Sequence, residues 1–96
     1  MARKQSVHPG FVRWLQEQKQ LGRRSAGDVK SHVLRVSALT DLDDPELEDT
    51  DVIYQLSKSH QFASLNLNTQ SHLRRAVRLY KEFIKYLNQE IRIDLF

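Results

Sequence analysis

The spacing of apolar residues between Thr69 and Leu87 constrains the fold more than any other feature of the chain. These residues are three or four positions apart, which is the periodicity of one face of an α-helix. The stripe consists of Leu73, Ala76, Val77, Tyr80, Phe83, Ile84 and Leu87. Because such a face is stable only when it packs against other apolar elements, we predict that this helix lies in the core.

Three shorter segments have the same periodicity, so the sequence predicts an all-α bundle of four to five helices. A first helix is expected from His8 to Leu21, and Gly22 is expected to end it in the left-handed conformation. A second is expected from the N-cap Ser25 to Thr40. The apolar residues of these two helices expected in the core are Phe11, Trp14, Leu15, Leu21, Val29, Val33, Val36 and Leu39.

An acidic connector, residues 41–49, follows the second helix, and its proline and aspartates break the helical pattern. A short third helix is expected from Thr50 to Ser59. Its inward residues are Val52, Ile53 and Leu56. Residues 60–68 are expected to form an irregular loop that can include one helical turn. Asn68 or Thr69 is expected to be the N-cap of the long last helix.

One domain is expected, because 96 residues are enough to bury a single core. It spans residues 8–88, and residues 1–7 are expected to form a flexible basic N-terminus. Residues 89–96 are expected to form a tail, and within it Ile91, Ile93 and Leu95 alternate with Arg92 and Asp94, which is the period-two pattern of an extended segment. The predicted fold class is therefore a helical bundle with a short extended C-terminal tail.

Charge is strongly segregated along the chain. Residues 1–40 carry a net charge of +6, residues 41–57 carry −7 and residues 58–96 carry +4. In the last helix a basic row lies beside the apolar stripe and consists of Arg74, Arg78, Lys81 and Lys85. Two basic blocks around an acidic connector favour a cationic surface for nucleic acid, and the alternative is a set of ordinary solvated helix faces.

The residue pattern does not favour an enzyme, a metal or a cofactor. The chain has no cysteine, and no two of its four histidines are three or four positions apart, as two zinc ligands on one helix face would be. The Asp41, Asp43, Asp44 run lacks the glycine of a calcium loop, since Glu46 stands in its place. We expect no catalytic residue and no small-molecule substrate.

The apolar runs are too short to predict a membrane-spanning helix, and the polar N-terminus does not have the pattern of a secretory signal. A basic amphipathic helix can lie on an anionic membrane only if it is free of a core. Since the last helix is expected to pack in the core, no membrane partner is expected, and the predicted location is cytoplasmic.

Four motifs follow one another in residues 8–88: an opening Phe-x-x-Trp-Leu, a Ser-capped helix, a short Asp-Val-Ile-Tyr-Gln-Leu helix and a Thr-capped last helix. Their positions are Phe11, Trp14, Leu15, Ser25, Val29, residues 51–56, Thr69, Leu73, Arg75, Ala76, Leu79, Tyr80, Phe83 and Leu87. In this order they resemble the core-binding domain of tyrosine recombinases and phage integrases, a SAM-like helical module. The catalytic residues of those enzymes would lie beyond Phe96. If the chain is full length and not a fragment of a longer recombinase, the resemblance therefore implies a phage or mobile-element protein that binds DNA without cutting it.

The resemblance also implies that the second and last helices clamp duplex DNA, with their N-terminal ends at the major groove. The residues that it favours are Arg23, Arg24, Ser25, Lys30, Ser31, Thr69, Gln70, His72, Arg74 and Arg75. Helix N-termini attract phosphates, and Gln, His and Arg side chains can reach base edges. Arg78, Lys81 and Lys85, further along the basic row, are expected either to contact phosphates or only to face the solvent.

The alternative hypothesis is a helical protein-interaction module, an adaptor or inhibitor whose basic face binds an acidic partner. Residues 92–96 resemble the pentapeptide by which many bacterial proteins bind the sliding clamp, with Arg92 in place of the usual glutamine. Ile93, Leu95 and Phe96 would anchor in the partner, or else fold onto the core or form a homodimer contact. This alternative is favoured if the basic residues of the two DNA-facing helices lie on opposite sides of the fold.

Overall fold

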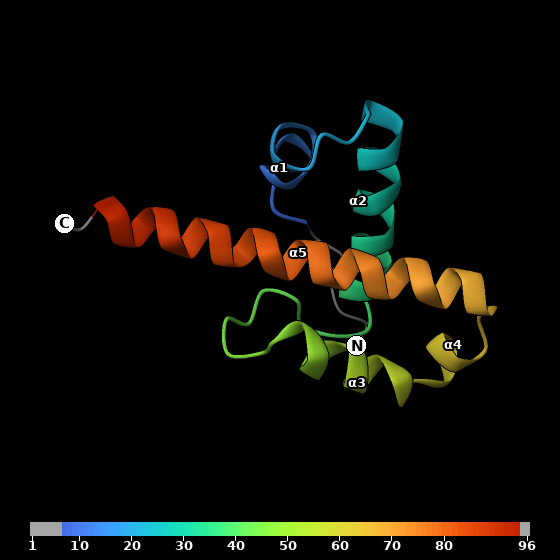
Figure 1. Ribbon diagram of the computed structural model, residues 1–96. Helices are drawn as coiled ribbons and strands as arrows, with labels where there is room; N and C mark the ends of the chain where they lie inside the picture. Colours follow the sequence, from blue (N-terminus) through green and yellow to red (C-terminus); the bar gives the residue numbers. More distant parts are fainter. Residues whose placement is uncertain (1–6, 95–96) are drawn as a thin grey trace.

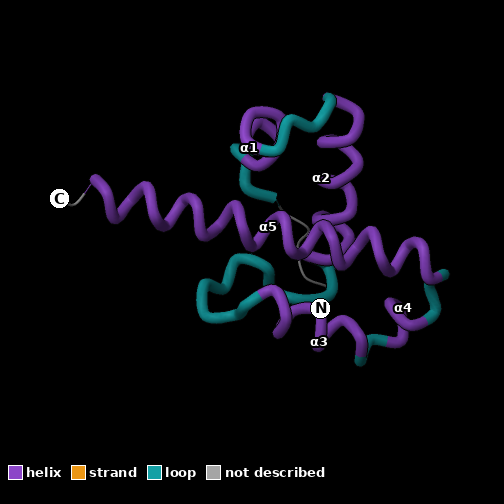
Figure 2. The backbone as a smooth tube through the Cα atoms, viewed as in Figure 1, coloured by secondary structure: helices purple, strands orange, loops and turns teal. Residues whose placement is uncertain are grey.

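The computed structural model of the protein describes residues 7–94, with the side chains of residues 7–89. It confirms the all-α class. The helices are α1 (Phe11–Gln18), α2 (Arg23–Ser37), α3 (Asp49–Ser57), α4 (His60–Ala63) and α5 (Leu67–Asp94). No residue in this described range belongs to a strand (Figure 2).

Helix α5 is the central element of the bundle. In Figure 1 it crosses the molecule between α1 and α2 on one side and α3 and α4 on the other. Its most extensive contact is with α2, and it also packs against α1 and α3. The apolar face of α5 is therefore covered by helices from both halves of the sequence.

One apolar core joins the five helices, and it contains most of the predicted residues. The buried apolar residues are Phe11, Trp14, Leu15, Ala26, Val29, Val33, Val36, Leu42, Val52, Leu56, Phe62, Leu73, Ala76, Val77, Tyr80 and Phe83. Leu39, Ile53 and Ile84 were expected in the core and pack against it while partly exposed. Leu42 and Phe62 come from segments predicted as connector and loop, which therefore also contribute to the core.

The predicted end of the first helix is wrong by about one turn. Helix α1 ends at Gln18, and Gln20 rather than Gly22 has a positive φ, of 55°. The N–H of Leu21 then bonds to the carbonyl of Leu15, a pattern that closes many helix ends. The chain reverses at Gln20, and Leu21 then packs on the core. The helix therefore ends where this packing requires it and not at Gly22.

The predicted N-caps are also displaced by two or three residues. Helix α2 begins at Arg23 with Gly22 as its N-cap, which places Ser25 inside the first turn. Helix α5 begins at Leu67, where the side chain of Asn66 accepts a hydrogen bond from the N–H of Thr69 at 2.8 Å. Gly22 and Ser25 are both suitable N-caps for α2, and the start of α5 also offers more than one capping residue. Local propensity does not determine which of them is used.

The prediction of an extended C-terminal tail is wrong for residues 91–94. Helix α5 continues to Asp94, so the alternation of apolar and charged residues there does not produce an extended segment. In Figure 1 this end of α5 projects beyond α1 and the connector. The side chain of Ile93, and Leu95 and Phe96 altogether, lie outside the described residues, so their predicted partner contacts are not tested.

Candidate nucleic-acid interface

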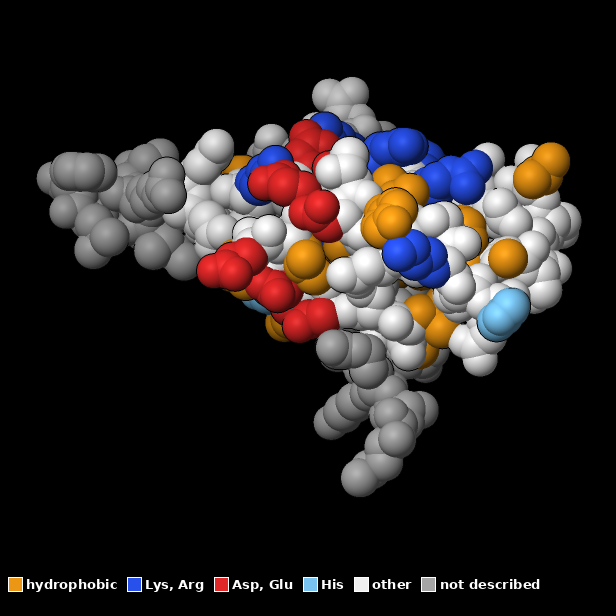
Figure 3. All heavy atoms as spheres, turned by 90° about the horizontal axis from the view of Figure 1, so that it is seen from below, with side chains coloured by type: hydrophobic (Ala, Val, Ile, Leu, Met, Phe, Trp, Pro, Cys, Tyr) orange, Lys and Arg blue, Asp and Glu red, His pale blue; other side chains and the backbone are white. Residues whose placement is uncertain are grey.

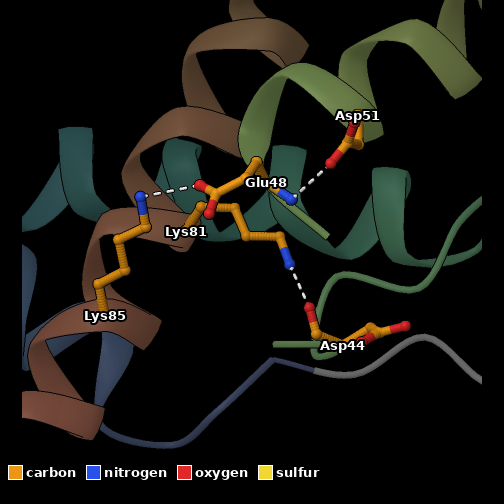
Figure 4. Close-up of polar contacts among 5 residues, drawn as sticks. All are labelled: Asp44, Glu48, Asp51, Lys81 and Lys85. Carbon is orange, nitrogen blue, oxygen red and sulfur yellow. Dashed lines mark hydrogen bonds and ion pairs between the residues drawn. The ribbon is translucent and has the colours of Figure 1, made fainter. Parts of the chain in front are cut away.

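The acidic connector binds the C-terminal part of the basic row of α5. The Nζ of Lys81 donates a hydrogen bond to the backbone carbonyl of Asp44 at 2.9 Å, and the Nζ of Lys85 forms an ion pair with Glu48 at 2.8 Å (Figure 4). The carboxylate of Asp51 accepts a hydrogen bond from the N–H of Glu48, which holds this residue at the start of α3. Both lysines of the row are therefore bound by the connector.

The predicted contact between Lys81 and a DNA phosphate does not fit this geometry. Lys81 is only 4% exposed. Burial lowers the pKa of its ammonium group, although Asp44, Asp41 and nearby carboxylates act in the opposite direction. An ammonium group already committed to a backbone carbonyl and surrounded by acids does not reach a phosphate at the surface, so we remove Lys81 from the candidate interface.

Tyr80 fixes the same connector from the core side. Its hydroxyl donates a hydrogen bond to Asp43 at 2.8 Å and accepts one from the N–H of His8 at 3.1 Å. Burial raises the pKa of this phenol to about 12. The connector is thus held against α5 at three neighbouring positions, Tyr80, Lys81 and Lys85, and its acids gather on one part of the face in Figure 3.

Gln70 also has a structural role in place of the predicted base contact. Its side-chain amide nitrogen donates hydrogen bonds to the carbonyls of Leu65, at 2.9 Å, and Phe62, at 3.3 Å. These carbonyls end α4 and begin the turn into α5, where helix carbonyls have no partner within the helix. Gln70 therefore orders this turn, and its amide hydrogens are not available to a base edge.

Three arginines of α5, Arg74, Arg75 and Arg78, have no ion pair among the described side chains, and we call them the arginine cluster. The guanidinium of Arg74 donates a hydrogen bond to the hydroxyl of Ser71 at 3.4 Å. Arg75 and Arg78 are exposed, and the guanidinium of Arg74 lies 6.0 Å from the ring centre of Phe62. Residues 58–80 contain no Asp or Glu, so the acids near the cluster come from other segments: Asp28 lines a groove with Arg75, and Asp49 and Glu82 line a pocket with Arg78.

A groove of about 290 Å³ separates the first half of α2 from α5. Ser25, Asp28 and His32 line it from α2, and His72 and Arg75 line it from α5. The rings of His32 and His72 lie parallel across the groove, with their centres 5.5 Å apart and an angle of 6° between their planes. The structure therefore brings together three of the predicted DNA-binding residues, Ser25, His72 and Arg75.

The other predicted residues of α2 do not join this groove. Arg23, Arg24, Lys30 and Ser31 are exposed. Lys30 is two positions from both Asp28 and His32, and residues at that spacing do not face the same side of a helix. On α5, Arg74 faces α4 through Phe62, whereas His72 and Arg75 face α2. The predicted basic residues are thus divided between the two edges of α5.

Sequence reasoning missed Asp28 and His32 as parts of the interface. Ser25, Asp28 and His32 are three and four positions apart, so they form one edge of α2 beside its apolar stripe. His32 has no partner at helical spacing in the sequence, and its neighbour His72 comes from a distant helix. The spacing in α2 was a usable signal, but the pairing of the two histidines depends on how α2 packs on α5.

The histidine pair predicts that acid weakens the fold. Partial burial and the neighbouring His72 lower the pKa of His32 below its ordinary value, while Asp28 acts in the opposite direction. The unfolded chain therefore binds this proton more readily than the folded one. The contribution of His32 to stability is complete above the ordinary pKa and is lost as the pH falls through the lowered value.

We expect the melting temperature in phosphate-free buffer to fall between about pH 7.5 and pH 5. The fall should be smaller for His32→Gln than for the wild-type protein, measured by circular dichroism. His60→Gln is the control, because His60 is exposed on α4 and should leave the pH dependence unchanged. Equal falls in all three proteins would contradict the assigned role of His32.

Comparisons of the chain with protein-family models, curated proteins and solved structures found no match. Within the described residues, no helix is long and apolar enough to cross a membrane, and no group of three or more His, Asp or Glu residues is placed to hold a metal ion. The similarity to recombinase core-binding domains stays a prediction, and the geometry of α2 and α5 is the basis for assigning a function.

Proposed function

We propose that the protein binds duplex DNA, without catalysing a reaction, through the arginine cluster and the adjacent edge of α2. The observation that carries this proposal is the contrast within one helix. Lys81 and Lys85 are bound by the connector, whereas Arg74, Arg75 and Arg78 have no carboxylate partner among the described side chains. Guanidinium groups are well suited to phosphate oxygens, because their planar donors can form paired hydrogen bonds.

The distribution of acids supports the same surface. Glu48 of the connector is paired with Lys85 on the α3 side of α5, and no connector acid lines the groove at Arg75, although Asp49 and Glu82 line a pocket with Arg78. Ser25 and His72 lie beside Arg75 and offer further hydrogen-bonding groups. The resemblance to recombinase core-binding domains adds support, because it also implies DNA contact by α2 and α5.

This interface is smaller than the clamp expected from the sequence. Lys81 and Gln70 have internal partners, and Lys30 faces away from the groove. The remaining arginines suit phosphate contacts, which supply affinity and orientation but no sequence information. We therefore expect weak sequence preference. The proposal also includes a cytoplasmic location, where the protein would bind phage or mobile-element DNA.

The test is a fluorescence-anisotropy titration of a duplex oligonucleotide at several salt concentrations. The triple variant Arg74→Gln, Arg75→Gln, Arg78→Gln should bind more weakly by on the order of tenfold or more, and the slope of log affinity against log salt should decrease by about two to three. Each lost phosphate contact removes roughly one released counterion from that slope.

The matched control removes three charges elsewhere. Arg13, Lys19 and Lys58 lie outside the interface, and the first two form ion pairs with Glu17 and Glu82. The control variant replaces all three with glutamine and should change the slope by less than one unit. If both triple variants change binding equally, only the net charge matters, and the assigned surface is wrong. If the wild-type protein binds no duplex at about 50 mM salt, DNA binding itself is wrong.

A protein-interaction module is the second candidate, and the division of basic residues between the two edges of α5 favours it. Leu67 at the start of α5 is 77% exposed, and Tyr54 on α3 is 61% exposed. Tyrosine is a common anchor in protein interfaces, whereas leucine is a less frequent one. This candidate predicts no salt-dependent duplex binding, so the titration above separates the two functions.

A further inference from the structure

The groove between α2 and α5 contains two histidines that none of the contacts described so far requires. Its lining comes from α2 and α5 alone. The charged or titratable groups facing His32 are Asp28 and Arg35 on its own helix and His72 and Arg75 on α5. Both imidazoles lie at the edge of the proposed DNA interface, because Arg75 belongs to the groove and to the arginine cluster.

The net charge of this groove depends on the protonation of the two histidines. With both imidazoles neutral, the charges of Asp28 and Arg75 cancel within the groove lining. With both protonated, the lining has a net charge of +2, and two parallel cationic rings lie 5.5 Å apart. Like charges at this separation repel each other unless an anion lies between or beside them.

We propose that the α2–α5 groove is a phosphate-binding site that is switched on by protonation of the His32–His72 pair. A phosphate group has the complementary charge and accepts hydrogen bonds from both imidazolium rings, the guanidinium of Arg75 and the hydroxyl of Ser25. This inference rests on the proposed function only for the source of the phosphate, which is then the DNA backbone.

Protonation of the histidines and binding of phosphate favour each other at this site. The neighbourhood of His32 disfavours its protonation, and a bound phosphate removes that penalty by placing a negative charge against the pair. By thermodynamic linkage, protonation must then tighten phosphate binding by the same factor. Histidine is the ordinary side chain that changes charge between about pH 5 and pH 8, so the switch operates in mildly acidic solution.

The first measurement is the ratio of duplex affinities at about pH 5.5 and pH 7.5, at constant ionic strength, for the full chain. The wild-type ratio should be roughly tenfold, which corresponds to an average uptake of about half a proton across these two pH units. In the double variant His32→Gln, His72→Gln the ratio should fall to about two, whatever its affinity at neutral pH. His60→Gln should keep the wild-type ratio. Circular dichroism at both pH values confirms that each variant is folded.

The second measurement uses inorganic phosphate and needs no DNA. Histidine ring signals are followed by NMR during a phosphate titration at the same two pH values, with chloride at equal ionic strength as the reference. The signals of His32 and His72 should move with phosphate at the acidic pH, and that of His60 should not.

The combined outcomes separate this inference from the proposed function. Duplex binding with the same pH ratio in wild type and double variant, together with unmoved ring signals, overturns the phosphate switch and leaves DNA binding intact. Absent duplex binding with moving His32 and His72 signals overturns DNA binding and supports a site for free phosphate groups. Absent duplex binding with unmoved signals overturns both.

Discussion

Replacement of Phe11 by alanine is expected to lower the free energy of unfolding by about 3 to 5 kcal/mol, a large part of the stability of a domain of this size. Phe11 is completely buried, and its ring centre lies 4.9 Å from that of Tyr80 and 5.5 Å from that of Phe83. These contacts join α1 to α5, and neighbouring rings cannot fill the resulting cavity without leaving their own positions.

Urea denaturation followed by circular dichroism measures this effect. Gln16→Ala is the matched control, because Gln16 is exposed on the same helix, and its effect should lie within about 0.5 kcal/mol. Phe11→Leu should lose less stability than Phe11→Ala, since it leaves a smaller cavity. A loss below about 1 kcal/mol for Phe11→Ala would mean that α1 is not an integral part of the core.

Replacement of Tyr80 by phenylalanine is expected to destabilise the protein by about 1 to 3 kcal/mol at neutral pH. The change keeps the ring in the core and removes only the hydroxyl that joins Asp43 of the connector to the N–H of His8. Tyr80 is 1% exposed, so water does not readily replace the lost hydroxyl. Tyr54→Phe is the control, because Tyr54 is 61% exposed and its hydroxyl has access to solvent.

The stability of the wild-type protein is also expected to fall at alkaline pH, and Tyr80→Phe tests this. The pKa of Tyr80 is raised from 10.0 to about 12, so the stability that its neutral form provides is complete below pH 10 and is lost as the pH rises through 12. The wild-type protein should therefore lose more stability than Tyr80→Phe above pH 10. The phenolate absorbance of the wild-type protein minus that of the variant should rise near pH 12. A rise near pH 10 would place the hydroxyl in solvent.

Most of the fold could be predicted because it depends on apolar periodicity. The stripe from Leu73 to Leu87 identified α5, and shorter stripes identified α1, α2 and α3. The exact ends could not be predicted where capping residues stand side by side, as at Asn66, Asn68 and Thr69. The extension of α5 through residues 91–94 was missed because alternation over six residues is too short to distinguish a strand from a helix end.

The site was less predictable, because it depends on contacts between distant residues. The basic row of α5 was visible in the sequence, but its division into lysines bound by the connector and arginines without an ion pair follows from the packing of the connector on Lys81 and Lys85. The acidic block and the basic row together were a signal for this pairing. The stacking of His32 on His72 had no such signal, since it requires the crossing of α2 and α5.

The central position of α5 also determines when the protein can fold during its synthesis. Helices α1 to α4 leave the ribosome first, but their apolar faces are covered by a helix that follows them in the chain. Contacts such as that between His8 and Tyr80 span 72 positions. Local pairs such as α1 with α2 can form early, whereas the complete core must wait until residues up to Phe83 have emerged. The nascent chain therefore exposes apolar surface for most of its translation, which is the period in which chaperone binding or aggregation competes with folding.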